Sequence, residues 1–196
     1  MAKTLLQMAG MTPAPARLSD SVLVLIDCQN EYRSGSLPLV GVDSAVKEVG
    51  RVLARARDAG TPVIHIAHKG GAGQLFDRDA DNGAIMDEVA PLQGEPVIEK
   101  PRPNAFYQTN LLDAVKATGR SQLIVAGFMT HMCISTTVRA AIDHGLFSTV
   151  VADACATRDL PSGDGGVVPG ADLHRAALAG LSDRFAVIVR DGAALG

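Results

Sequence analysis

The chain has 196 residues, of which 47% are hydrophobic and 20% are charged, and its formal net charge is −3. This length suits one domain with a large core, and the charge argues against a nucleic-acid surface, which needs clustered Lys and Arg. Trp is absent and only 4% of the residues are aromatic. An aliphatic core of this kind is typical of a parallel sheet that helices cover on both faces.

The cysteines and the N-terminal segment suggest where the protein works. Cys28, Cys133 and Cys155 match no zinc spacing and are too few for a disulfide scaffold. We therefore predict a reducing, cytoplasmic location. Residues 1–20 lack the pattern of a signal peptide, and no apolar run is long enough to span a membrane. We expect an N-terminal arm here, loose or packed on a partner subunit, before a single domain at residues 21–196.

Strand-like and helix-like segments alternate along the rest of the chain. The apolar runs of strand length lie at residues 21–27, 61–68, 96–100, 122–126, 148–153 and 185–189. The segments with helical periodicity lie at residues 42–59, 110–118, 132–143 and 171–181, with a short helix at 85–89. This alternation predicts a Rossmann-like, doubly wound, mostly parallel six-stranded sheet in three α/β/α layers.

Cys133 lies where an apolar strand gives way to a helix, the arrangement of a nucleophile elbow. The free amides at a helix N-terminus favour negative charge, so we expect this thiol to ionise easily. The same amides can bind an oxyanion. The alternative is a small buried cysteine that only fills space in the core.

Two other ionisable residues end predicted strands, Asp27 after residues 21–26 and Lys100 after residues 96–99. The carboxyl ends of parallel strands lie along one edge of a sheet, so both side chains can converge on Cys133. Asp27 would be the base and Cys133 the nucleophile, while the Lys100 ammonium would favour the thiolate. Taken singly, Asp27 could cap a turn and Lys100 could lie on the surface. The combination of the three favours a catalytic site.

These residues belong to motifs that occur in a recognisable order. The motifs are DCQNEY at residues 27–32, EK at 99–100, NAF at 104–106, TNL at 109–111, GFMTHMC at 127–133 and TVRAA at 137–141. From about residue 21 to residue 189 the chain resembles the isochorismatase-like cysteine hydrolases. The resemblance implies an Asp27–Lys100–Cys133 triad that hydrolyses an amide through a thioester acyl-enzyme and releases ammonia or an amine.

The resemblance also implies a cis peptide bond between Phe128 and Met129. The amides of Met129 and Cys133 would then form the oxyanion hole. Family members that act on isochorismate, a vinyl ether, can lack the cysteine, so the presence of Cys133 favours the amidase branch. The family commonly forms oligomers, and we expect a homo-oligomer, either a dimer or a tetramer.

Further residues are expected around a small-molecule pocket, and none of them forms a metal site. Nicotinamidases of this family bind zinc through an Asp-x-His pair, but Val63 and Ile66 stand two residues before His65 and His68. We therefore predict no metal and no cofactor, and His65 as a core residue with a satisfied partner. The expected pocket wall consists of Gln29, Tyr32, His68, Phe76, Phe106, Tyr107 and His131.

Two other functions stay open from the sequence. One is an isochorismatase-type vinyl-ether hydrolase with Asp27 as the acid, and the other is a non-enzymatic α/β module that binds a ligand. Replacement of Cys133 separates the first from an amidohydrolase. The substrate is left open, because residues 69–83 and 159–170, which we expect to shape the pocket, have no readable pattern.

Overall fold

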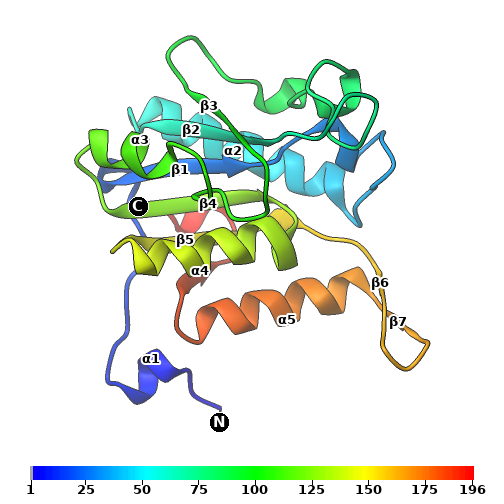
Figure 1. Cartoon of the computed structure of the whole chain (residues 1–196). Coiled ribbons are helices and arrows are strands. Elements are labelled where there is room, and N and C mark those ends of the chain that lie inside the picture. The colour runs from blue at the N-terminus through cyan, green and yellow to red at the C-terminus, as the bar shows by residue number, and fades with distance from the viewer. Residues whose placement is uncertain (1) are drawn as a thin grey trace.

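A parallel β-sheet forms the centre of the computed structural model, which describes residues 2–196 (Figure 1). Its strand order is β3-β2-β1-β4-β5-β8, and all neighbouring strands are parallel. The strands are β1 (Ser21–Ile26), β2 (Val63–His68), β3 (Val97–Lys100), β4 (Gln122–Phe128), β5 (Phe147–Ala156) and β8 (Ala186–Val189). The predicted six-stranded, doubly wound α/β sheet is therefore confirmed.

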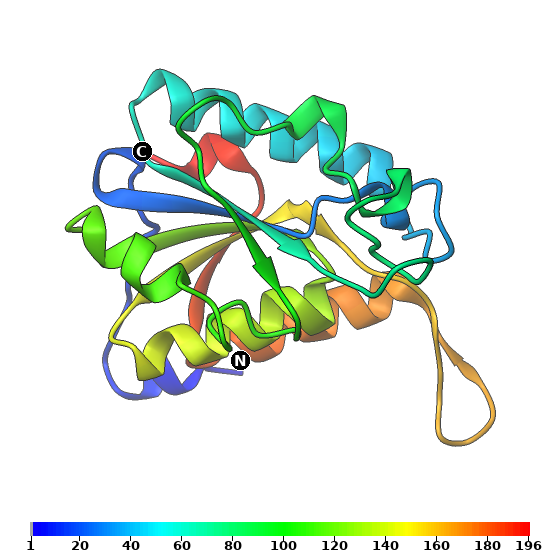
Figure 2. The ribbon, with the colours of Figure 1, turned by 45° about the horizontal axis from the view of Figure 1, so that its top comes forward.

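Helices cover both faces of the sheet and create two separate cores (Figure 2). One face carries α2 (Val42–Asp58), and the other carries α3 (Leu111–Ala117), α4 (Ser135–Asp143) and α5 (Gly170–Ser182). Alternate residues of β1 enter the two cores: Leu23 packs on the α2 side and Val24 on the α4 side. Every residue of β1 is buried, which explains its uninterrupted apolar sequence.

The N-terminal arm lies against its own chain. It contains the short helix α1 (Leu5–Met8), which Figure 1 shows beside the end of α5. The backbone N–H of Leu5 donates to Asp183 Oδ1 at 2.8 Å, and the N–H of Ala16 donates to Thr149 Oγ1, also at 2.8 Å. These contacts tie the arm to Asp183 after α5 and to Thr149 of β5.

Some elements differ from their predicted bounds. The helix expected from residue 132 begins at Ser135, because the chain first makes a π-helical turn over Thr130–Ile134. The segment expected as a short helix at residues 85–89 is a 3₁₀ turn at Asp87–Val89. The predicted loop after β5 contains a projecting hairpin made of two further strands, β6 (Leu160–Pro161) and β7 (Val167–Val168) (Figure 2).

None of the helices in residues 2–196 is long and apolar enough to cross a membrane.

Gly127 is required where β1 and β4 end side by side. It pairs with Ile26 in the sheet and has a φ of +116°. A Cβ at this position would overlap the carbonyl oxygen of Ile26. Asp27 follows β1 and Cys133 follows β4. The close approach of the two strand ends at Gly127 therefore sets the distance between the segments that carry these two residues.

We expect Gly127→Ala to lower the free energy of unfolding by more than about 3 kcal/mol, because both the positive φ and the backbone overlap oppose a side chain. Gly119→Ala is the matched control, since Gly119 also has a positive φ, of +71°, but no atom lies within 4 Å of its added Cβ. The control should cost about 1–2 kcal/mol. Urea denaturation of both variants measures the difference, and equal losses would contradict this view of Gly127.

Candidate active site

Three ionisable residues meet at the carboxyl ends of β1, β3 and β4. Lys100 Nζ lies 2.8 Å from Asp27 Oδ2 and 3.3 Å from Cys133 Sγ. Asp27 and Lys100 are completely buried, and Cys133 is 3% exposed. The sheet order reverses between β1 and β4, and open α/β sheets bind ligands at such a switch point. The convergence expected from the sequence is therefore present.

Lys100 reaches this point from β3, which lies two strands away from β1. That separation amounts to about 10 Å, so the group that spans it needs a long stem, and lysine has four methylenes. Ile98, two residues before Lys100, packs in the same core as Cys133. Because alternate strand residues share a face, Lys100 points to the face of the sheet that carries Cys133.

Asp27 leaves β1 in an unusual backbone conformation, with a φ of +52°. Its N–H donates to the Ile66 carbonyl oxygen at 2.9 Å, and its own carbonyl oxygen accepts from the N–H of Gln29 at 2.8 Å. Asp tolerates this left-handed region better than most residues. Within residues 2–196, the buried Asp27 Oδ1 accepts no hydrogen bond. An unsatisfied carboxylate oxygen beside a thiol is suited to accept a proton.

The sequence predicted that the Cys133 thiol ionises easily, and the structure shows the opposite direction of its pKa shift. Burial and the negative charge of Asp27 raise the pKa of Cys133 to about 12, although the Lys100 ammonium opposes this shift. The loss of water around the sulfur outweighs the favourable helix N-terminus and the ammonium. The resting group is therefore a thiol.

The turn that carries Cys133 is fixed by unusual backbone geometry. The peptide bond between Phe128 and Met129 is cis, as the family resemblance implied. The next residue, Thr130, begins the π-helical turn, and its hydroxyl donates to the Ala156 carbonyl oxygen at 3.1 Å and lies 2.8 Å from His174 Nδ1. The oxyanion hole at the Met129 and Cys133 amides stays a prediction.

A cavity of about 640 Å³ has its wall at the end of β2 and in the following loop, and none of the triad residues lines it. It is lined by His68, Gly70, Gly73, Gln74, Leu75 and Phe76. The Phe76 ring packs edge-on against His68 at 5.0 Å and against Tyr32 at 5.1 Å, measured between ring centroids. Three of the expected pocket residues, Tyr32, His68 and Phe76, are therefore neighbours, and of these His68 and Phe76 line the cavity.

Gln29 lies under this wall and is completely buried. Its Nε2 donates to the carbonyl oxygens of His68 at 3.0 Å and Gly83 at 2.8 Å, and its Oε1 accepts from the His68 N–H at 2.8 Å. The side-chain amide thus joins the end of β2 to Gly83, at the far end of residues 69–83, which we call the pocket loop. We expect it to shape the pocket through these backbone contacts.

The other expected wall residues lie elsewhere. Phe106 packs on His144, which follows α4 at the opposite end from Cys133, with the ring centroids 4.9 Å apart. Tyr107 is 48% exposed, and neither it nor Phe106 lines the cavity of about 640 Å³. His131 Nδ1 lies 2.6 Å from Thr157 Oγ1. Sequence proximity to Lys100 or Cys133 did not place these side chains in the cavity, because Phe106 packs against the core and His131 contacts Thr157 instead.

Glu31 is a buried site residue that the sequence reasoning missed. It accepts hydrogen bonds from the N–H groups of Ser36 and Phe76 and from the Asn82 side-chain amide. The carboxylate therefore holds the pocket loop against the segment after β1. Its position inside the motif at residues 27–32 was the one available signal, since no periodicity marks a buried acid in an irregular turn.

The two histidines of β2 have separate partners. His65 is buried as predicted, and its Nε2 lies 2.9 Å from Glu95 Oε2. His68 Nδ1 lies 3.1 Å from Lys100 Nζ. Among residues 2–196, no group of three His, Cys, Asp or Glu side chains is arranged to hold a metal ion.

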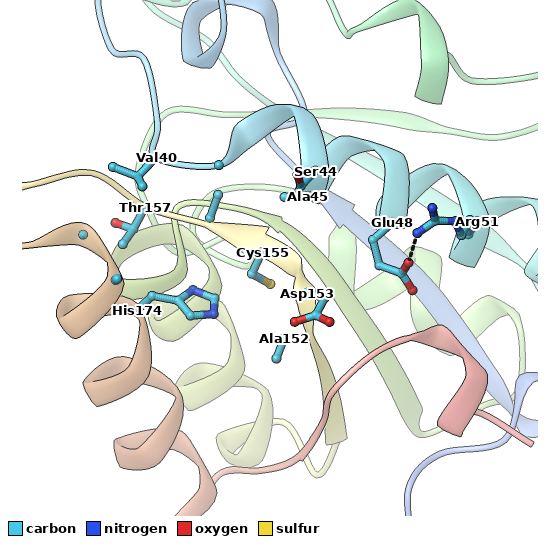
Figure 3. A pocket seen from close by; sticks show the side chains of 14 residues that line it. Val40, Ser44, Ala45, Glu48, Arg51, Ala152, Asp153, Cys155, Thr157 and His174 are labelled. Carbon is cyan, nitrogen blue, oxygen red and sulfur yellow. Dashed lines mark hydrogen bonds and ion pairs between the residues drawn. The ribbon is translucent and has the colours of Figure 1, made fainter.

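A second cavity, of about 420 Å³, lies between α2, β5 and α5 (Figure 3). The side chains of Asp153, Cys155 and His174 face it from β5 and α5. The triad does not line it. Burial raises the pKa of Cys155 to about 12, as it does for Cys133, but within residues 2–196 no lysine donates to the Cys155 sulfur as Lys100 does to Cys133.

Comparisons with known proteins point to one protein family. Residues 21–191 match the family model described as the isochorismatase domain. A crystal structure of an isochorismatase from Pseudomonas putida is 43% identical, with both chains covered completely and a TM-score of 0.96. A secreted isochorismatase effector from Verticillium dahliae is 35% identical over 93% of this chain and 94% of its own. A ureidoacrylate amidohydrolase from Methylobacterium radiotolerans is 28% identical over 88% of this chain and 78% of its own.

The raised thiol pKa leads to a spectroscopic prediction. We expect no thiolate absorbance at 240 nm between pH 7 and pH 9 in the native protein, because burial and Asp27 hold the Cys133 proton in place. Cys28 and Cys155 also have raised pKa values, mainly through burial, so they add no signal in this range. A one-thiolate step below pH 9 that is absent from Cys133→Ala would contradict the prediction.

Proposed function

The chain belongs to the isochorismatase family, and we propose that it is a cysteine amidohydrolase that cleaves a small amide or carbamoyl compound. Asp27 acts as the base, Cys133 as the nucleophile and Lys100 as the electrostatic partner of both. The observation that supports this most directly is the position of Lys100 Nζ, 2.8 Å from Asp27 and 3.3 Å from Cys133. A thiol, a carboxylate and an ammonium at contact distance have the chemistry for acyl transfer.

The first half-reaction transfers the acyl group to sulfur. The Cys133 proton passes to the Asp27 carboxylate as Sγ bonds to the substrate carbonyl carbon, and the carbonyl electron pair moves to oxygen. The intermediate collapses when the carbon–nitrogen bond breaks and the Asp27 proton passes to the leaving nitrogen. Ammonia or an amine departs, and a thioester remains on Cys133.

The second half-reaction repeats these roles with water. Asp27 takes a proton from a water molecule as the oxygen of that water bonds to the thioester carbon. The carbon–sulfur bond then breaks. The proton returns to Cys133, and the acid leaves. Lys100 stays charged throughout and stabilises the negative charge that passes between Asp27 and Cys133.

The oxyanion of each tetrahedral intermediate needs donors of its own. We assign this role to the backbone amides of Met129 and Cys133, as the family resemblance implies. Backbone donors are fixed in direction before the reaction, so they stabilise developing charge without reorganising. The π-helical turn at Thr130–Ile134 would aim them.

A vinyl-ether hydrolase is the second candidate function. It is favoured by the isochorismatase names of the relatives at 43% and 35% identity, whereas the amidohydrolase relative is 28% identical. In that reaction a protonated Asp27 would act as the acid, and sulfur would have no covalent role.

We further propose a reducing, cytoplasmic location and a dimer or tetramer of this chain. The three cysteines are all buried and unpaired, which is usual in reducing compartments.

A screen of primary amides and carbamoyl compounds for ammonia release tests the proposed function. We expect Cys133→Ala to lower kcat/KM by at least about 1,000-fold and Asp27→Asn by at least about 100-fold, because each removes a group that forms or transfers a bond. Cys155→Ala is the matched control, since it removes a buried thiol outside the triad and should retain activity.

Mass spectrometry of the wild-type protein during turnover should find the acyl group on the peptide that contains Cys133. Full turnover of an amide by Cys133→Ala would refute the thioester route. If that variant instead hydrolyses a vinyl ether such as isochorismate at the wild-type rate, the second candidate function is the correct one.

A further inference from the structure

His68 is the third polar neighbour of the Lys100 ammonium. Lys100 Nζ lies 2.8 Å from Asp27, 3.3 Å from Cys133 and 3.1 Å from His68 Nδ1. A lysine ammonium has three N–H bonds and no acceptor. With these three neighbours, each N–H has one acceptor, and a completely buried ammonium needs that compensation.

The contact fixes the chemical form of His68. Because Lys100 can only donate, Nδ1 must be unprotonated and must accept. A neutral imidazole with a free Nδ1 carries its proton on Nε2. Within residues 2–196 no group hydrogen-bonds His68 Nε2, and His68 is the lining residue that connects the cavity of about 640 Å³ to Lys100.

We propose that neutral His68 is a positioning residue for Lys100, and that its Nε2–H is the donor that binds an acceptor oxygen of the substrate in this cavity. The proposal rests on the amidohydrolase function for its second part only. The oxygen can belong to a carbonyl or to a carboxylate of the substrate.

The fold holds His68 firmly in this position. His68 and Lys100 are register partners on β2 and β3, so their side chains leave the sheet side by side. Gln29 binds both the N–H and the carbonyl oxygen of His68. The Phe76 ring packs against the imidazole at 5.0 Å. These contacts fix the backbone and the ring plane, so the direction of both ring nitrogens is set before substrate enters.

The surrounding charges favour the neutral ring. Two charged groups face His68, Lys100 from β3 and Asp27 after β1, and the Cys133 thiol is uncharged at neutral pH. Burial and the Lys100 ammonium lower the pKa of His68, and Asp27 opposes this only in part. Acidification that protonates His68 would place a second cation against Lys100 and remove its third acceptor.

NMR of the full chain labelled with ¹⁵N-histidine tests the first part without any substrate. We expect the His68 ring to be neutral at pH 7 with its proton on Nε2, and its pKa to rise in Lys100→Met. If that variant does not fold, Asp27→Asn/Lys100→Met removes both buried charges and should raise the pKa as well. A ring that is charged at pH 7, or protonated on Nδ1, would overturn the proposal.

Kinetics test the second part with the amide found in the ammonia-release screen. We expect His68→Phe, which keeps a flat ring beside Phe76, to lower kcat about 10- to 100-fold and to raise KM. His68→Asn supplies a carbonyl acceptor and should recover at least threefold of kcat. His144→Asn is the matched control, because His144 lies at the far end of α4 and should leave kcat, KM and the pH profile unchanged.

The two parts fail in distinguishable ways. Wild-type kcat and KM in His68→Phe would show that His68 does not bind the substrate, even if the amidohydrolase function holds. Absence of any amide hydrolysis would remove the proposed function, while the NMR titration would still decide whether His68 accepts from Lys100.

Discussion

The site depends on one buried ammonium. Lys100 is completely enclosed, and its charge is compensated by the Asp27 carboxylate at 2.8 Å, with the Cys133 sulfur and the His68 ring completing its surroundings. Removing one partner of a buried ion pair costs about 3–5 kcal/mol, because the other charge is left uncompensated. The Asp27–Lys100 pair therefore links the ends of β1 and β3, and the contact of Lys100 with Cys133 adds the segment after β4. The same two residues supply the charges that the proposed reaction uses.

This arrangement also explains why the cysteine rests as a thiol. The positive charge of Lys100 is already balanced by Asp27, so little of it is left to stabilise a thiolate in a dry environment. Burial and Asp27 consequently raise the thiol pKa to about 12. In the proposed reaction, Cys133 becomes nucleophilic when Asp27 takes its proton during the attack on the substrate, which couples deprotonation to bond formation and keeps the resting sulfur unreactive.

Around the triad, the backbone is organised by side chains that have no direct role in bond formation. Gln29 joins β2 to the pocket loop, and Glu31 holds the same loop through Phe76 and Asn82. Gly127 allows β1 and β4 to end close together. Each of these residues lies within or beside a motif that contains a triad member, so a single motif combines chemistry with the local structure that positions it.

The sequence by itself determined the architecture and pointed to the three ionisable residues that meet at the strand ends. Buried strands have an almost continuous apolar sequence, and parallel strand ends share an edge, so the convergence of Asp27, Lys100 and Cys133 followed from their positions alone. The tertiary structure decided what depends on distant neighbours. It set the high pKa of Cys133, turned Phe106 toward His144 and placed His68 against Lys100. Burial, charge and loop direction arise from contacts between segments far apart in the chain, and local sequence patterns carry no record of them.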